Sequence, residues 1–269
     1  MKRVLFTCAL LAGMATALHG QVEPRPFPPT TAPTSRALTV LTFNIHHAEG
    51  TDGKVDVPRI ARIIHDTQAD IVGLQEVDRG VERTGRRDLL KELADLTGMR
   101  FAFGKNIDHQ GGDYGNAMLT SRPIVSVGNK LLPNVDGGES RGVLQVVVDV
   151  EGTQVLVLTT HLDHRAADPQ RVASADAILE MLQAFGSGPV IAMGDFNDVP
   201  GSTTWTRLMT VFTDTWAAVG RGDGFTIPVE APTKRIDWIL VRGLEPVSAE
   251  VLKSDASDHL PVLGVLKLR

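Results

Sequence analysis

Side chains that could hold a metal ion and activate water recur where apolar runs of the sequence end. Asn44, Glu76 and Asp258 offer hard oxygen ligands, which suit Mg²⁺ or Mn²⁺ better than they suit zinc. His259 stands next to an acid, and the ordinary pKa of histidine is near neutrality, as a general base for water requires. An aspartate that accepted one ring N–H would hold such a histidine in the useful tautomer.

Further polar residues supply the other half of a hydrolytic site. His161 and Asn197 could donate hydrogen bonds to phosphate oxygens as charge grows on them. Metal ligands, a base and phosphate donors together describe the hydrolysis of a phosphate ester. Single members have plainer explanations: Glu76 as a strand-end carboxylate, Asp195 as the cap of a turn, Asp258 as a helix cap or loop residue. Six such clusters at successive strand ends favour the site over these alternatives.

The apolar patterns predict the elements that must position these residues. Residues 57–64 have the i, i+3, i+4, i+7 spacing of a helix, 87–97 form a helix that ends at Gly98, and 172–185 carry the clearest helical stripe. The predicted strands are 38–43, 70–75, 101–103, 117–120, 143–150, 155–160, 189–193, 236–241, 247–252 and 262–268. Mixed strands and helices with hairpins in the middle predict an α/β fold, with sheets packed face to face and helices outside.

The first residues differ in character from the rest. Residues 1–17 have a basic start, a short apolar run and a small-x-small end, which predicts a signal peptide too short to anchor the protein in a membrane. The proline-rich stretch 18–37 predicts a linker, and 38–269 one domain. We therefore expect export to the periplasm or the medium, without disulfides, since the only cysteine, Cys8, lies in the signal.

Composition narrows the range of partners. Lys and Arg number 27 against 32 Asp and Glu, so the net charge is −5, and 42% of residues are hydrophobic. These values exclude a disordered chain and give no general attraction to nucleic acid, although a local basic groove is compatible with them.

The motifs resemble those of the endonuclease/exonuclease/phosphatase superfamily and occur in the same order. The matching residues are Thr42-Phe43-Asn44, Leu74-Gln75-Glu76-Val77, Thr159 to Leu162, Gly194-Asp195-Phe196-Asn197, Arg235-Ile236-Asp237 and Ser257-Asp258-His259-Leu260-Pro261. The resemblance covers nearly all of 38–269. It implies a four-layer α/β/β/α sandwich of two mixed sheets flanked by helices, and hydrolysis of phosphoesters with Mg²⁺ or Mn²⁺.

The resemblance also implies a role for each residue. Glu76 would be the principal metal ligand, with Asn44 beside it, and Asp258 would lie near a possible second metal. His259 would be the general base or a transition-state stabiliser. The remaining roles are Asp237 to orient that histidine, Asp195 with Asn197 to position or deprotonate water, His161 and Tyr114 to contact the phosphate, and Arg141 to face the substrate or support the structure.

Two features depart from the pattern. Where abasic-site endonucleases have an aspartate two positions after the asparagine, this chain has His46, which could bind metal or substrate or be an exposed loop residue. The arginine-rich segment from Arg83 to Arg87 resembles a subfamily of exported bacterial proteins, and it could bind an anionic group or be a solvated loop.

The sequence favours a phosphodiester over a phosphomonoester and leaves the substrate open among small molecules, lipid head groups and nucleic acid. A nuclease acting on DNA or RNA would need a basic groove, and a phosphoesterase acting on a lipid head group would need an exposed apolar or aromatic hairpin. A catalytically dead binding domain on the same fold is the alternative of another class. We expect a monomer without a stable membrane anchor.

Overall fold

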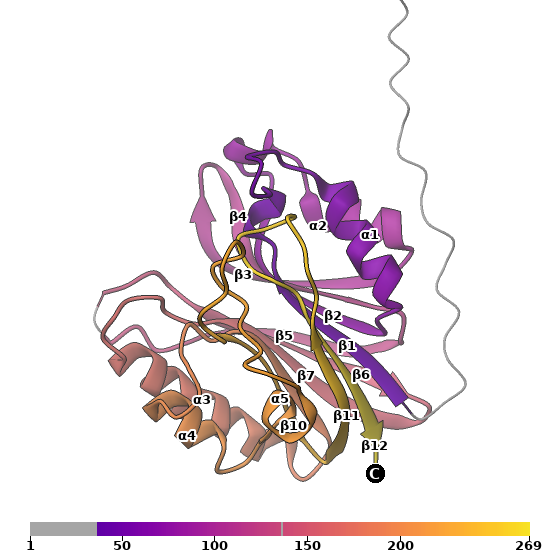
Figure 1. Cartoon of the computed structure of the whole chain (residues 1–269), viewed down its shortest axis with the longest axis vertical. Helices are drawn as coiled ribbons and strands as arrows, with labels where there is room; N and C mark the ends of the chain where they lie inside the picture. Colours follow the sequence, from indigo (N-terminus) through magenta and orange to yellow (C-terminus); the bar gives the residue numbers. More distant parts are fainter. Residues whose placement is uncertain (1–36, 136) are drawn as a thin grey trace, which may run out of the picture.

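Two six-stranded mixed sheets pack against each other at the centre of the molecule (Figure 1). The computed structural model describes residues 37–135 and 137–269. The predicted signal peptide at 1–17 and nearly all of the predicted linker at 18–37 lie outside the described residues. Both sheets carry helices on their outer faces, so the predicted four-layer α/β/β/α sandwich is confirmed.

The first sheet has the order β11-β12-β1-β2-β4-β3. Its strands are β1 (Ala37–Asn44), β2 (Ile71–Arg79), β3 (Arg100–His109), β4 (Gly112–Thr120), β11 (Leu244–Val251) and β12 (Val262–Leu268). Strands β1 and β2 are parallel, whereas β12 pairs with β1 in the antiparallel sense. The carboxyl ends of β1 and β2 therefore meet at one edge of this sheet.

The second sheet has the order β5-β6-β7-β8-β10-β9. Its strands are β5 (Ile124–Leu131), β6 (Gly142–Val150), β7 (Thr153–His161), β8 (Val190–Asp195), β9 (Thr213–Asp214) and β10 (Asp237–Arg242). Strands β7 and β8 are parallel and β10 is antiparallel to β8. The start of β10 therefore lies beside the end of β8.

Alternation of side chains along the strands divides the core into layers. In β1, Leu38 and Val40 belong to the apolar cluster between the sheets, while Leu41 and Phe43 belong to the cluster beneath the first pair of helices. This is the period of two that a strand buried on both faces requires. A third cluster, which includes Phe196, lies between the second sheet and its helices.

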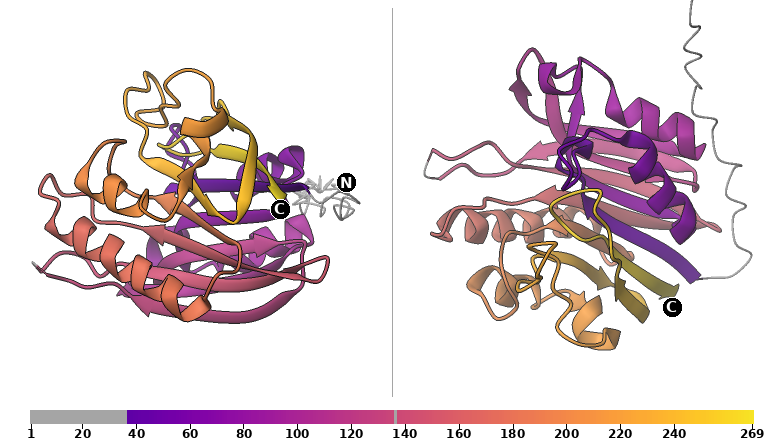
Figure 2. Two further views of the ribbon diagram at one scale, coloured as in Figure 1. Left: turned by 90° about the horizontal axis from the view of Figure 1, so that it is seen from below. Right: turned by 45° about the horizontal axis from the view of Figure 1, so that its top comes forward.

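The helices follow from capping residues and apolar stripes. On the first sheet lie α1 (Val57–Thr67), capped by Asp56, and α2 (Leu89–Thr97), capped by Asp88. Next to the second sheet lie α3 (Pro169–Phe185) and α4 (Thr203–Leu208), and α5 (Thr215–Val219) contacts β10 and β11. Figure 2 shows these helices outside the sheets from two further directions. In the described part of the chain, no helix has the length and apolar character needed to cross a membrane.

The structure corrects several predicted elements. Strands β3 and β4 extend well beyond the predicted 101–103 and 117–120, because they form one long hairpin whose polar outer part carries no apolar signal. Strand β5 was not predicted, since seven of its eight residues are exposed and its edge position asks for no apolar run. The elements β9, α4 and α5 were not predicted either, because segments of two to six residues are too short to show a period.

Candidate active site

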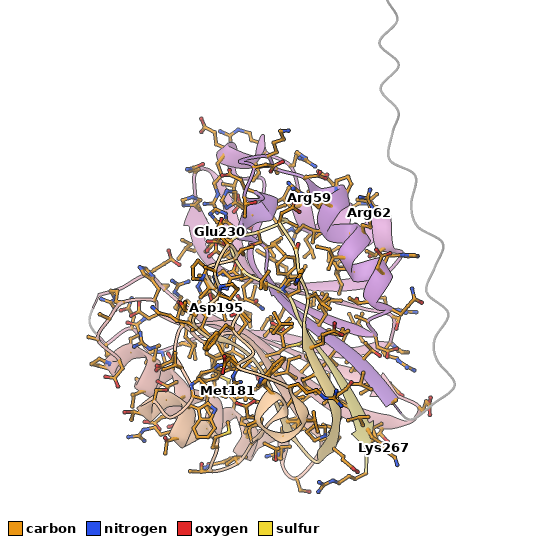
Figure 3. All side chains as sticks on the ribbon, viewed as in Figure 1. Arg59, Arg62, Met181, Asp195, Glu230 and Lys267 are labelled. Atoms are coloured by element: carbon orange, nitrogen blue, oxygen red, sulfur yellow. The ribbon has the colours of Figure 1, made fainter. Side chains whose placement is uncertain are left out.

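Polar residues from both sheets converge on one cleft of about 270 Å³. Its lining residues are Glu76, Tyr114, Glu139, Arg141, His161, His164, Asp195, Asn197 and His259. Seven of these nine are residues that the sequence singles out, and the other two are Glu139 and His164. A larger groove of about 650 Å³ lies between α5 and β11 and contains none of the predicted site residues. In Figure 3, Asp195 lies between Arg59 on α1 and Met181 on α3, that is, between the two helical layers.

Asn44 links the two sheets across this cleft. Its side-chain N–H groups donate to Glu76 Oε1 and to Asp195 Oδ2, each at 3.1 Å, and its amide oxygen accepts from the backbone N–H of His46 at 3.1 Å. Two carboxylates on one side and an N–H on the other fix the orientation of the amide. In this arrangement Asn44 holds the two acids close together, and its role as a metal ligand stays a prediction.

The sequence predicted that Glu76 directly follows a strand, but the structure places it within β2, at a bulge. The pairing with β4 passes from Leu74–Ala117 to Val77–Gly115, so the two residues Gln75 and Glu76 face Asn116 alone. Glu76 has a φ of 60°, which is uncommon for a residue with a side chain. The bulge turns its carboxylate into the cleft instead of into either sheet face, at the cost of backbone strain that functional sites often carry.

Strand pairing brings His161 and Asp195 side by side. The two residues are direct partners at the ends of β7 and β8, and His161 Nε2 lies 3.5 Å from Asp195 Oδ2. Gly194 allows this close approach, because a Cβ there would stand 1.9 Å from the carbonyl oxygen of Thr160. Burial, and then the positive charge of Arg141, lower the pKa of His161 well below its usual value, so this ring is neutral and can donate one N–H.

A hydrogen-bonded chain orients His259. Its Nδ1 lies 2.9 Å from Asp237 Oδ2, and the same oxygen accepts from the hydroxyl of Thr226 at 2.5 Å. Its Nε2 points to Asp195, 3.7 Å from Oδ2. The loop that carries it is tied to the end of β1 by the Ser257 hydroxyl, which donates to the Asn44 carbonyl at 2.7 Å. The side chain at 259 is thus fixed from both sheets.

The charges around His259 decide its protonation state. Burial works to lower its pKa, but the carboxylates of Asp237 and Asp195 outweigh burial and raise the pKa to about 10. Burial also raises the pKa of Asp195, to about 7, with the negative charge of Asp237 adding to the effect and His259 opposing it. At neutral pH the imidazole is therefore charged, and Asp195 is the group poised to accept a proton.

Tyr114, Arg141 and Asn197 complete the lining. Arg141 is 3% exposed, and its Nη1 lies 3.0 Å from Glu139 Oε1. Burial, followed by the charge of Glu76, raises the pKa of Tyr114, so its hydroxyl stays protonated as a hydrogen-bond donor. The backbone N–H of Asn197 donates to Asp195 Oδ1 at 2.9 Å, and asparagine tolerates the φ of 50° that this turn requires.

Asp258 does not join the cleft, and His46 lies beside it without lining it. Asp258 is exposed and is absent from the cleft lining, and its Oδ1 accepts from the Ser257 hydroxyl at 3.3 Å. The structure therefore does not bring its carboxylate to Glu76, because the backbone that turns His259 inward turns Asp258 outward. His46 lies in the 3-10 turn η1 (His46–Ala48), on the Glu76 side of the site, and is not an exposed loop residue.

Four residues near the site were not assigned to it from the sequence. Glu139 and His164 line the cleft, and His164 Nδ1 lies 3.3 Å from Arg141 Nη2. Thr226 supports Asp237 from a loop, and His47 lies beside Glu76. Only the tertiary fold brings them here, although two adjacent histidines directly after a predicted strand end could have drawn attention to His47.

The donor set fits a divalent cation. Glu76 is only partly buried, and its carboxylate faces Asn44 with no hydrogen bond from an arginine or lysine among those found in the described chain. Hard oxygen atoms of this kind, together with the nearby histidines, are ligands for divalent ions. A divalent ion would offset the negative charge of a phosphate group in the cleft.

Comparison with known proteins agrees with this geometry. Residues 41–259 match the Endonuclease/Exonuclease/phosphatase family. The protein YbhP of Escherichia coli strain K12 is 30% identical over 252 residues, a match that covers 86% of this chain and 97% of the relative.

Solved structures share the fold. An endonuclease/exonuclease/phosphatase from Beutenbergia cavernae is 28% identical, with a TM-score of 0.68 over 87% of this chain and 72% of its own. A mannosyl-6-phosphatase from Bacteroides thetaiotaomicron is 22% identical, with a TM-score of 0.73 over 85% of this chain and 99% of its own. This chain thus belongs to the endonuclease/exonuclease/phosphatase family, whose members hydrolyse phosphoester bonds with divalent metal ions.

Proposed function

We propose that this protein is an exported, divalent-metal-dependent phosphoesterase that hydrolyses a small phosphodiester or phosphomonoester. The observation that carries the proposal is the convergence of Glu76, Asp195 and His259 on one cleft, from three segments distant in the sequence. A dead binding domain would be expected to have lost at least one of these groups. The oxygen donors Glu76 and Asn44 favour Mg²⁺ or Mn²⁺ as the ion.

The chain's own groups divide the reaction between them. Asp195, with its raised pKa, accepts a proton from the attacking water, and Asn197 holds its second oxygen. The phosphate takes hydrogen bonds from neutral His161 and from Tyr114, and its charge faces Arg141. Charged His259 donates from Nε2 to the phosphoryl oxygens as negative charge develops, so the structure favours the stabiliser role over that of general base.

The arginine-rich segment supports a small substrate over a nucleic acid. Arg83 donates to Asp78 through two hydrogen bonds of 2.8 and 2.9 Å, and Arg87 binds Glu92. Arg79 and Arg86 also have carboxylate partners, Asp88 and Glu82. Because these charges are neutralised within the chain, the segment neither forms the basic track that a nuclease needs nor behaves as a free solvated loop.

An assay of the purified mature chain tests the proposal. Bis-p-nitrophenyl phosphate, p-nitrophenyl phosphate, sugar phosphates, inositol phosphates, sphingomyelin, DNA and RNA would each be offered with Mg²⁺ or Mn²⁺, and with EDTA as a control. Hydrolysis of a small ester that EDTA abolishes is the expected result. Exclusive cleavage of DNA or RNA would favour the nuclease alternative, and no hydrolysis of any ester would favour the binding domain.

We also propose, from the sequence alone, that the protein is exported and that it is a monomer. The first 17 residues have the layout of a signal peptide. The mass of the protein recovered from the periplasm or medium should match a chain beginning at Leu18. A full-length chain retained in the cytoplasm would contradict export.

Glu76→Gln should weaken the dependence on metal before anything else. The amide keeps the size of the side chain and one oxygen but removes the charge that binds the ion. We expect the metal concentration for half-maximal activity to rise about tenfold or more. Glu82→Gln, at an exposed acid that does not line the cleft, is the control and should leave the metal titration unchanged. An unaltered titration in Glu76→Gln would remove this residue from the metal site.

Asp237→Asn should shift the alkaline limb of the pH profile. The Asp237 carboxylate raises the pKa of His259, whose charged form is present below that pKa and is lost as pH rises through it. Removing the carboxylate lowers the pKa, so activity should decline at a lower pH than the value near 10 expected for the native enzyme. We also expect turnover to fall about 10- to 100-fold. A pH–rate profile of kcat identical to that of the native enzyme would show that the pairing has no role.

A further inference from the structure

A second group of possible ligands lies beside the Glu76 carboxylate. His46, His47 and Glu76 each offer a ligand atom, and these three atoms lie within 4.8 Å of one another. The rings of the two histidines meet edge to face, with their centroids 4.4 Å apart. This group shares no member with the cluster of Asp195, Asp237 and His259, and it contains two imidazoles and a single carboxylate.

The backbone after β1 brings both imidazoles to this place. His46, His47 and Ala48 are consecutive residues with φ values of 43°, 44° and 63°. The turn is held by the Ala48 N–H, which donates to the Ile45 carbonyl at 2.7 Å, and by the Asn44 amide oxygen, which accepts from the His46 N–H. Two adjacent side chains can thus serve one site, which a regular strand or helix would not permit.

One of these histidines is buried with an unused nitrogen. His47 is 7% exposed, and its Nδ1 has no hydrogen-bond partner in the part of the chain that the structure describes. Its other ring nitrogen, Nε2, lies 3.5 Å from Glu49 Oε2. A carboxylate at one ring nitrogen of a histidine is the arrangement that orients the other nitrogen toward a metal ion. An unpartnered buried nitrogen is costly to keep, and a metal ion would satisfy it.

The surrounding charge permits a cation here. Arg83 is close enough to act on both His47 and Glu76. Its guanidinium is held by the fully buried Asp78 in a bidentate ion pair, with Nε–Oδ2 and Nη2–Oδ1 distances of 2.8 and 2.9 Å. The arginine and the aspartate together add little net charge, so the negative charge of Glu76 remains available to an ion.

We propose that His46, His47 and Glu76 form a two-histidine, one-carboxylate site that binds a first-row transition-metal ion in preference to Mg²⁺. Imidazole nitrogen suits ions such as Fe²⁺, Ni²⁺ and Zn²⁺, and among first-row ions Mn²⁺ has the lowest affinity for such ligands. Mg²⁺ is held by oxygen ligands and parts with its water reluctantly, so two imidazoles favour a transition-metal ion over it. Two ligand atoms that each lie about 2.1 Å from a shared ion are at most about 4.2 Å apart. The three ligand atoms here lie within 4.8 Å of one another, so small side-chain movements would bring them to one ion. This inference rests on the proposed function, because Glu76 serves both, and it narrows the choice between Mg²⁺ and Mn²⁺ to the latter.

Pulsed electron paramagnetic resonance of Mn²⁺ bound to the full chain tests the site directly. With ¹⁵N-labelled histidine, the native protein should show hyperfine coupling of Mn²⁺ to imidazole nitrogen, and a hundredfold excess of Mg²⁺ should leave most of the Mn²⁺ in place. His46→Ala and His47→Ala should each reduce the nitrogen coupling and weaken Mn²⁺ binding tenfold or more. His47→Gln, which keeps the bulk of the ring, covers the case in which His47→Ala does not fold.

Matched controls separate this inference from the proposed function. His65→Ala, on α1 outside the cluster, should leave both coupling and affinity unchanged, and His46→Asp should bind Mg²⁺ better than the native chain does. Mn²⁺ without nitrogen coupling in the native protein would overturn the inference, as would unchanged binding in both histidine variants. If Mg²⁺-dependent hydrolysis persists in that case, the proposed function stands. If the bound Mn²⁺ shows nitrogen coupling but the protein hydrolyses no phosphoester, the metal site is supported and the proposed function is rejected.

Discussion

Replacing His259 should reduce kcat/KM about a thousandfold. The side chain is the charged donor nearest the base, with Asp237 behind it at 2.9 Å and Asp195 before it at 3.7 Å. Removing one such preorganised donor from a phosphoryl or acyl transfer site costs about 10²–10³ in turnover, and loss of the positive charge adds to this. The expected loss is in kcat more than in KM, because the interaction strengthens as the transition state forms.

The choice of substitution matters for this experiment. His259→Ala leaves the buried Asp237 carboxylate without its charged partner and should also destabilise the fold. His259→Gln keeps an N–H that can reach Asp237 but carries no charge, so it separates catalysis from stability. Steady-state kinetics and thermal unfolding of both variants, with His65→Ala as the control, would separate the loss of turnover from the loss of stability. Near-native turnover in a folded His259→Gln would show that the charge at this position has no part in the reaction.

Asp195→Asn should be nearly as damaging and should also reshape the acid side of the pH profile. The acid is 1% exposed, and burial raises its pKa to about 7. As the base it must be ionised, so native activity should rise with pH through this range and plateau above it. The amide retains the shape of the side chain but cannot take a proton, and we expect turnover to fall about 10²- to 10⁴-fold.

The acid limb provides the sharper readout. In Asp195→Asn the residual activity should lose the rise near neutral pH, because the group that titrates there is gone. Rate measurements from pH 5 to 10 at saturating metal would show this. Asp198→Asn is a matched control, because Asp198 follows the turn directly and does not line the cleft. A variant that keeps the acid limb at its native position would assign the limb to another group and would contradict Asp195 as the base.

Sequence patterns predicted the layers of this fold because its central strands are apolar on both faces. Strand β12 was predicted with its observed bounds, and β1 to within one residue at each end. Four of the six residues from Leu38 to Phe43 are apolar, and the other two are threonines, which also favour strands. The hairpin of β3 and β4 was cut short, because residues such as Lys105 and Asp113 form an ion pair at its polar outer end and resemble a loop. Its pairing depends on the partner strand, not on local composition.

The motifs of the sequence predicted which residues form the site, but they could not predict its geometry. Nothing in Leu74-Gln75-Glu76-Val77 indicates that a bulge turns Glu76 into the cleft, since this depends on the register with β4. Nor does sequence order show that Asp258 and His259, which are adjacent, face opposite ways. The motifs also could not predict the protonation state of His259, because its positive charge depends on two acids that only the fold brings to it.

The antiparallel pairing of β1 with β12 has a consequence for how the protein is made. Strand β12 separates β1 from β11, and the loop that carries His259 precedes it directly. Strand β1 is the first strand of the domain and β12 is the last, so their pairing joins the two ends of the sequence, and such distant pairing is slow. A chain that ends before residue 259 would lack both the strand that lies beside β1 in the first sheet and His259, so the fold and the candidate site become complete only with the C-terminal segment.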